Sequence, residues 1–241
     1  MLVNRTYFII TTFLMLIVLS ILLKDVITAG MITWVVSVAG YIIIGYIRNK
    51  KRLRLLEEMC DPQAFIEATE RQRKITGKDR KINACLDVDR SAGLILMGKF
   101  QEAKEVLLSI NKSYLSNING ILLAYTINLM SCLYELGEID EAEALFETQV
   151  PLLSPVNRPL RLAMKSLAAD RLFFLNRYEE SREKFRQLLG EKINKRVRLG
   201  ILYRLAQIDQ KAGDMRSAEK KFKEVADNGN QLWIAAQAQK Q

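Results

Sequence analysis

The chain has 241 residues, enough for one or two domains, with a formal net charge of +9 and a hydrophobic content of 49%. It contains no histidine, which excludes Ser-His-Asp and Cys-His catalysis, histidine-ligated zinc and histidine pH switching. Its three cysteines, Cys60, Cys85 and Cys132, are far apart and lack C-x-x-C spacing. We therefore expect no cofactor and no metal, and three buried free thiols in a reducing compartment.

The first 47 residues form an apolar leader. Their only charged side chains are Arg5, Lys24 and Asp25. The two uncharged runs on either side of Lys24 and Asp25 approach or reach the ~20 residues with which a helix crosses a bilayer. We expect residues 1–47 to form a transmembrane hairpin, with spans at about 5–24 and 28–47. A cleaved signal peptide is the alternative for the first run, but that run exceeds the ~7–15 residues of a signal h-region and a second run follows directly.

A basic cluster follows the second run and predicts the orientation of the hairpin. By the positive-inside rule this end of the span is cytoplasmic, so we expect a multi-pass protein of the cell membrane with both termini cytoplasmic. Basic side chains beside a bilayer also attract anionic lipid headgroups. The linker over 48–60 therefore contributes five candidate lipid-contacting residues: Arg48, Lys50, Lys51, Arg52 and Arg54.

From residue 61 onward the sequence predicts a helical repeat domain. A phrase with Gly or Asn at a turn, followed by a small residue, occurs four times, and the small residues are Ala103, Ala142, Ser181 and Ala218. Their spacings of 39, 39 and 37 residues, with a helix-length apolar pattern on each side, indicate repeated helix pairs. Glycine at the turn suits the left-handed conformation that ends a helix. We expect four pairs, at 82–110, 118–150, 159–189 and 197–226.

This pattern resembles the tetratricopeptide repeat (TPR) family. The second unit shows the family positions most fully, as Leu129, Leu133, Gly137, Ile139, Ala142 and Phe146. The period departs from the family's 34 residues, and Asp209 stands where the family usually has an aromatic residue. The resemblance implies an all-α fold, with a TPR-like solenoid over 61–241 behind the transmembrane hairpin. Solenoids need terminal caps, which we expect at 61–75 and 231–240, the second with Leu232, Trp233 and Ala236 facing inward.

The resemblance also implies where a partner would bind. In the family, ligands usually lie in a concave groove lined by the first helix of each pair. Carried over by position, the candidate groove residues are Ile127, Ser131, Tyr134, Asp170, Phe173, Phe174, Tyr203 and Gln207. Apolar and aromatic residues at helical spacing are also typical of a core between repeats, so both interpretations stay open.

The function that these features favour is a membrane-anchored interaction or scaffold protein that presents a cytoplasmic TPR-like surface to a protein or peptide. A juxtamembrane regulator that binds lipid or nucleic acid through its basic residues is the alternative. Nucleic acid is the less favoured partner, because the positive charge clusters beside the expected bilayer. We do not expect an enzyme, since candidate acids such as Asp87, Asp89 and Asp170 are scattered and no phosphate-binding glycine loop is present.

Overall fold

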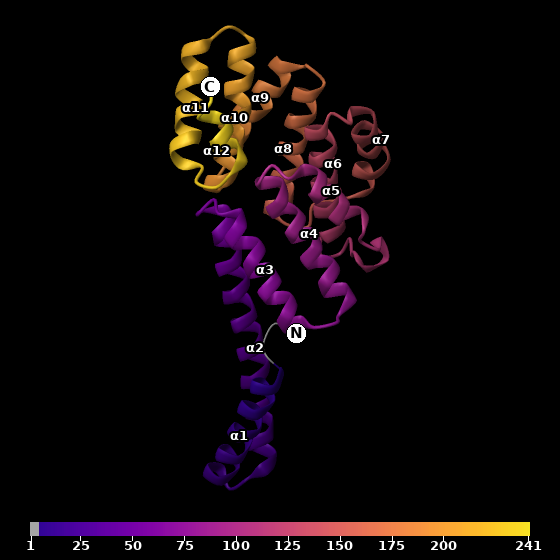
Figure 1. Ribbon diagram of the computed structural model, residues 1–241. Helices are drawn as coiled ribbons and strands as arrows, with labels where there is room; N and C mark the ends of the chain where they lie inside the picture. Colours follow the sequence, from indigo (N-terminus) through magenta and orange to yellow (C-terminus); the bar gives the residue numbers. More distant parts are fainter. Residues whose placement is uncertain (1–4) are drawn as a thin grey trace.

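The computed structural model describes residues 5–241, and the regular structure in that range is entirely helical (Figure 1). It comprises twelve α-helices and two short 3-10 helices, which confirms the all-α fold class. The α-helices are α1 (Arg5–Leu23), α2 (Val26–Glu57), α3 (Pro62–Thr76), α4 (Arg80–Leu96), α5 (Phe100–Leu108), α6 (Ile121–Leu136), α7 (Ile139–Gln149), α8 (Arg158–Phe174), α9 (Tyr178–Leu189), α10 (Lys195–Lys211), α11 (Met215–Asn228) and α12 (Trp233–Ala238). The 3-10 helices are η1 (Lys112–Tyr114) and η2 (Val150–Leu152).

Helices α1 and α2 form an antiparallel apolar hairpin at one end of the molecule (Figure 1). The rings of Phe8 and Tyr41 meet edge to face at 5.8 Å, and Thr12 Oγ1 lies 3.2 Å from Ser37 Oγ. Asp25 caps α2 by accepting hydrogen bonds from the amides of the following turn. By length and composition both helices could cross a bilayer.

Helix α2 does not end where its apolar run ends. It continues to Glu57, so most of the predicted linker over 48–60 is helical. At Asp61 the chain reverses: the Asp61 side chain caps α3 by accepting from the amide of Ala64, and Pro62 occupies the first turn. Helix α3 then packs back along α2 and forms the first cap of the repeat region, against α4.

The helices in the four predicted ranges pack as sequential pairs, α4 with α5, α6 with α7, α8 with α9 and α10 with α11. The first helix of each pair ends at a residue with a left-handed backbone, as the turn residues predicted. These residues are Gly98, Gly137, Asn176 and Gly213, with φ of +75°, +79°, +61° and +82°. The small residue that follows each turn is at most 1% exposed, because the two helices of a pair cross closest there.

Asp209 is buried and holds α9, α10 and α11 together. Its carboxylate accepts from Ser217 Oγ at 2.8 Å and from Lys221 Nζ at 2.6 Å, and it lies 3.3 Å from Arg182 Nη2. These three helices are thus joined by a cluster of charged and polar side chains.

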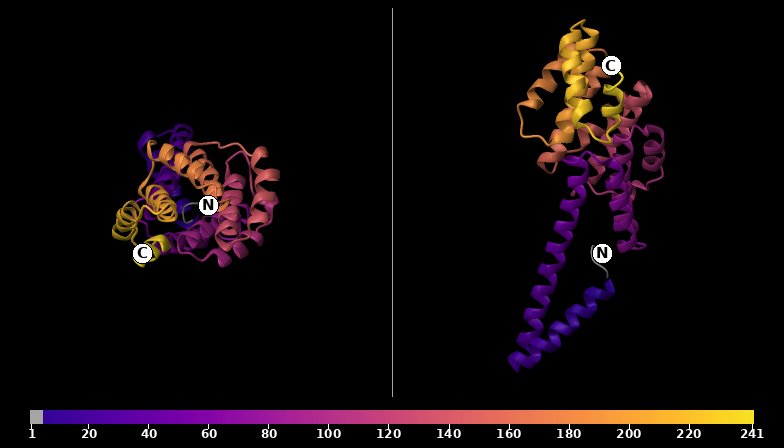
Figure 2. Two further views of the ribbon diagram at one scale, coloured as in Figure 1. Left: turned by 90° about the horizontal axis from the view of Figure 1, so that it is seen from above. Right: turned by 60° about the vertical axis from the view of Figure 1, so that its left-hand side comes forward.

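The helix pairs curve until the two ends of the repeat region meet, so the region closes into a ring (Figure 2). The amide of Gln231 donates to the carbonyl oxygen of Cys60 at 3.2 Å, and Asn230 Nδ2 donates to that of Met59 at 2.9 Å. The Cys60 side chain is fully buried in the same core cluster as Leu232. The C-terminal cap therefore also joins the last repeat to the α2–α3 corner.

The ring is closed a second time at the turn between α4 and α5. The indole of Trp233 packs edge to face on Phe100 at 5.3 Å and on Tyr203 at 5.4 Å. A Cβ atom on Gly98 would lie 3.0 Å from that of Trp233, so the two backbones approach closely. Leu232 and Trp233 face inward as expected. The prediction for Ala236 is wrong, because α12 turns that residue to solvent and buries Ile234, Ala235 and Ala238 instead.

Candidate functional site

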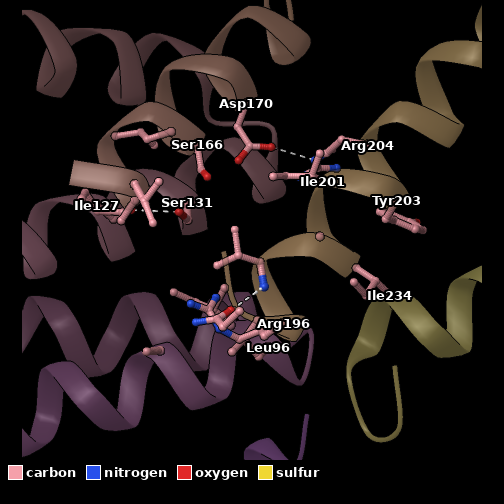
Figure 3. Close-up of a pocket in the computed structure, with 18 of the residues that line it drawn as sticks. Leu96, Ile127, Ser131, Ser166, Asp170, Arg196, Ile201, Tyr203, Arg204 and Ile234 are labelled. Carbon is pink, nitrogen blue, oxygen red and sulfur yellow. Dashed lines mark hydrogen bonds and ion pairs between the residues drawn. The ribbon is translucent and has the colours of Figure 1, made fainter. Parts of the chain in front are cut away.

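Closure of the ring creates a cavity of about 580 Å³ at its centre (Figure 3). The first helices of the four pairs, α4, α6, α8 and α10, all contribute to its wall. The end of α2 and helix α12 complete it, so both closing elements also line the cavity. The wall is mostly apolar with a few charged groups, which is typical of ligand-binding cavities.

Six of the eight predicted groove residues line this cavity. They are Ile127, Ser131, Tyr134, Asp170, Phe174 and Tyr203. The other two do not line it: Phe173 is buried in the core between α8 and α10, and Gln207 accepts a hydrogen bond from Arg204 Nη1 at 3.0 Å.

Tyr134 belongs to the repeat packing as much as to the cavity. Its side chain is 1% exposed, and its ring stacks on Phe174 at 5.1 Å. Its hydroxyl donates to Glu143 Oε1 at 2.6 Å, and Glu143 in turn accepts hydrogen bonds from both Nε and Nη2 of Arg171. Burial, then the adjacent Glu143 carboxylate, raises the pKa of Tyr134 well above its usual value. The core interpretation of this aromatic residue is therefore the better one.

One side of the cavity carries an ion triad centred on Arg204 (Figure 3). Arg204 Nε donates to Asp170 Oδ1 at 2.9 Å, and Arg204 Nη2 donates to Glu135 Oε1. The guanidinium also lies 4.9 Å from the ring centres of Phe173 and Phe174. Three successive first helices are thus joined by one cation.

Burial governs the titration of this triad. It raises the pKa values of Glu135 and Asp170, and the nearby Arg204 offsets only part of that rise. Burial alone would lower the pKa of Arg204, but the two carboxylates raise it by more, so the cation stays charged. Each of the three guanidinium nitrogens of Arg204 donates a hydrogen bond to a neighbouring side chain, which makes Arg204 a structural group in the cavity wall.

A second arginine, Arg196, lies across the cavity beside Leu96 (Figure 3). Its Nε atom is buried and has no hydrogen-bond acceptor among the described residues. Burial lowers the pKa of Arg196, while the charge of Glu57 raises it in part. A buried guanidinium donor without an acceptor favours a ligand that brings one.

The five predicted lipid-contacting residues divide into two groups. Four of them are exposed along α2, just beyond the apolar run: Arg48, Lys50, Lys51 and Arg54. Arg52 instead turns toward the repeat region, where its guanidinium lies 2.7 Å from Asp89 Oδ2 and donates to Thr69 Oγ1 at 3.1 Å. It also lies 5.4 Å from the ring of Phe65. Arg52 therefore ties α2 to α3 and α4.

Two of the three cysteines are buried and the third is half-buried. Burial raises the pKa of Cys132 to about 12, and burial also raises the pKa values of Cys60 and Cys85. The expected burial is thus correct for Cys60 and Cys132, whereas Cys85 reaches the surface in part. Thiols with raised pKa values are poor nucleophiles at neutral pH.

Sequence reasoning missed Arg196 and the role of Arg204. Arg204 gave one signal, a cation within a mostly apolar stretch of α10, whereas Arg196 lies between Lys195 and Arg198 in a basic run that is typical of a solvent-exposed surface. No protein-family model, curated protein or solved structure matches this chain.

Proposed function

We propose that this chain is a membrane-anchored protein-interaction module, with TPR-like repeats closed into a ring that binds a protein segment in its central cavity. The observation that carries the proposal is the 580 Å³ cavity lined by the first helix of every pair. In the family that the repeats resemble, these helices line the ligand groove. Here the same surface faces inward.

Membrane attachment is assigned to the α1–α2 hairpin. Most of its large apolar side chains point outward, and the only charged residues from Thr6 to Ile47 are Lys24 and Asp25, at its tip. A bilayer around the hairpin would cover this apolar surface. The exposed basic residues at the end of the second span support a cytoplasmic position for the repeat ring, at the surface of the cell membrane and with anionic headgroups around these residues.

The ligand that fits the cavity is a protein segment with an apolar side chain and a carboxylate. The apolar part would lie against Ile127 and Phe174, which supply apolar wall. The carboxylate would meet Arg196, whose buried Nε atom has no acceptor within residues 5–241. Arg204 would not contribute, because its two carboxylates already neutralise it.

A cavity-filling substitution tests the proposal without removing a structural side chain. Ser131 and Ser166 line the cavity and are only partly buried, so Ser131→Trp would occupy space that a ligand needs. A photo-crosslinking amino acid at Ser166 in the full-length protein, in native membranes, should capture a defined partner. Ser131→Trp should abolish that capture.

The size-matched control is Ser109→Trp, at an exposed position at the end of α5. It should leave the capture through Ser166 unchanged. Capture that survives Ser131→Trp, or that Ser109→Trp reduces equally, would show that the cavity is not the binding site. An Arg196→Gln variant that keeps full capture would remove the carboxylate from the proposal and leave the cavity itself in place.

A further inference from the structure

The connection between α3 and α4 carries a dense positive charge that no internal contact explains. We define the α3–α4 tip as residues 74–81. Lys74, Lys78 and Lys81 are exposed there and have no ion-pair partner among the described residues. The only acidic residue between positions 71 and 86 is Asp79, whose carboxylate accepts from the amide of Ile82 at 3.0 Å as the cap of α4. Arg80 donates one long hydrogen bond, of 3.4 Å, to Tyr114 Oη.

The register between α2 and α3 places this tip at the height where α2 becomes apolar. The hydrogen bond of 3.1 Å from Arg52 Nη1 to Thr69 Oγ1 shows where the two helices pass each other. Arg52 is about 7.5 Å along α2 beyond Ile47, at 1.5 Å per residue. Gly77 is about 12 Å along α3 beyond Thr69, and α3 runs back toward the hairpin. The tip therefore reaches the level of the last apolar residues of the second span.

The overall view agrees with this register. Both figures of the whole chain show the α3–α4 connection near the height of the start of α1, on the side of the ring that faces the hairpin (Figures 1 and 2). The turn between α10 and α11 lies on the side of the ring away from the hairpin (Figure 1). Positive charge is thus concentrated where a bilayer around α1 and α2 would have its headgroups.

We propose that the α3–α4 tip is a second membrane contact, which binds the anionic headgroups of the leaflet that surrounds the end of α2. This inference rests on the proposed crossing of the bilayer by α1 and α2. Charges act over about 8 Å at physiological ionic strength, so lysines at this height lie within the field of the leaflet. Anchored by the hairpin alone, α2 and the ring that is fixed to it could tilt together in the bilayer, whereas a second contact holds them at one angle.

Anionic lipid is the partner that the position of the tip favours over nucleic acid. A nucleic-acid site needs room for a strand along its basic surface, but a tip at headgroup height faces the bilayer. The consequence for function is that the central cavity is presented at a fixed distance and tilt from the membrane.

Hydrogen exchange of the full-length protein in lipid nanodiscs tests this. The backbone amides of residues 78–81 donate no hydrogen bond within the described residues, so they exchange fast unless something covers them. Two disc compositions are compared, phosphatidylcholine alone and phosphatidylcholine with about one-third phosphatidylserine. We expect exchange at the tip to slow by roughly 25-fold in the anionic discs, because two engaged lysines contribute about fivefold each to docking and the two factors multiply. Added salt should reverse the effect.

Two charge-reversal variants separate the tip from net charge. The tip variant is Lys74→Glu with Lys78→Glu and Lys81→Glu, and it should lose the protection in anionic discs. The control variant is Arg216→Glu with Lys220→Glu and Lys223→Glu, at exposed positions on α11 far from the hairpin. The control variant should keep the protection of the tip in anionic discs. Unchanged exchange of α6 and α8 amides shows that both variants are folded.

Equal exchange at the tip in both disc types would overturn the proposal, and so would equal behaviour of the two variants. Protection by added RNA in phosphatidylcholine discs, without protection by anionic lipid, would transfer the site to nucleic acid. Failure of the anchor gives a different result, since α1 and α2 amides would then exchange rapidly in discs of either composition.

Discussion

Removal of Arg204 should expose the energetic role of the buried triad. In an Arg204→Met variant the apolar side chain keeps part of the packing on Phe173 and Phe174 but leaves Glu135 and Asp170 without a cation. The side chain of Arg204 is 11% exposed and that of Glu135 is 16% exposed, so solvent screens the pair weakly. Breaking a buried ion pair from one side costs roughly 3–5 kcal/mol, and the greater exposure of Asp170 places the expected loss near about 3 kcal/mol.

The loss should depend on pH with a defined sign. Burial raises the pKa values of both carboxylates, and removal of Arg204 takes away the group that opposes this rise. As the pH falls toward the ordinary carboxyl pKa, the folded variant then binds more protons than its unfolded chain, so its stability rises relative to the parent protein. The difference between the two proteins should therefore shrink on acidification.

Urea unfolding of the full chain in mild detergent measures this loss of unfolding free energy at each pH. The probe is the emission of Trp233 in a Trp34→Phe background, because Trp233 lies where the ring closes. The exposed ion pair of Arg198 with Glu224 provides the control, and Arg198→Met should cost at most about 1 kcal/mol. A loss below about 1 kcal/mol for Arg204→Met that is independent of pH would refute the triad as a buried, coupled unit.

Three further outcomes follow from local geometry. Gly98→Ala and Gly137→Ala both place a Cβ at positive φ, but only the Cβ at position 98 meets the C-terminal cap. Gly98→Ala should therefore lower the free energy of unfolding by about 1–3 kcal/mol more than Gly137→Ala in the same urea assay. Equal losses would mean that the ring is open in solution. A maleimide at neutral pH should modify Cys85 before Cys132 when tryptic peptides are followed by mass spectrometry, and early labelling of Cys132 would contradict its burial. Burial raises the pKa of Asp209, but its hydroxyl and cationic partners lower the pKa by more, so it lies below the ordinary value. The Asp209→Asn variant should therefore lose about 2 kcal/mol of unfolding free energy at pH 7, and progressively less below about pH 4. A loss that is constant with pH would show that Asp209 acts through packing alone.

The repeated turn phrase was readable because it is local. Each turn requires a left-handed residue after the first helix and, a few positions later, a small residue that packs between the two helices. Gly137 and Ala142 meet these two requirements, so their residue types alone predict the local geometry. The same holds for the N-cap at Asp61, which sets the α2–α3 corner. The period of these local signals was enough to predict paired helices throughout the repeat region.

The candidate site was only partly readable from the pattern. Position within a first helix correctly placed residues such as Ser131 and Asp170 at the inner surface. Position alone could not separate residues of the cavity wall from residues of the core, because both lie on the apolar face of the helix. Phe173 and Tyr134, which were predicted to line the groove, are buried in the packing between helices. Arg52 shows the same limit among the basic residues, since one helical face of α2 points to solvent and another to Asp89.

The amino-acid sequence by itself determined the apolar hairpin, the paired helices and their turns, because each depends on residues close together in the chain. Only the tertiary structure decided that the repeats close into a ring around a cavity. That closure joins Met59 to Asn230 and depends on small rotations that accumulate over four helix pairs, and no local pattern encodes their sum. The same accumulation brought Arg204 between Glu135 and Asp170 from three different helices, and left Arg196 with its buried donor unsatisfied in the cavity wall.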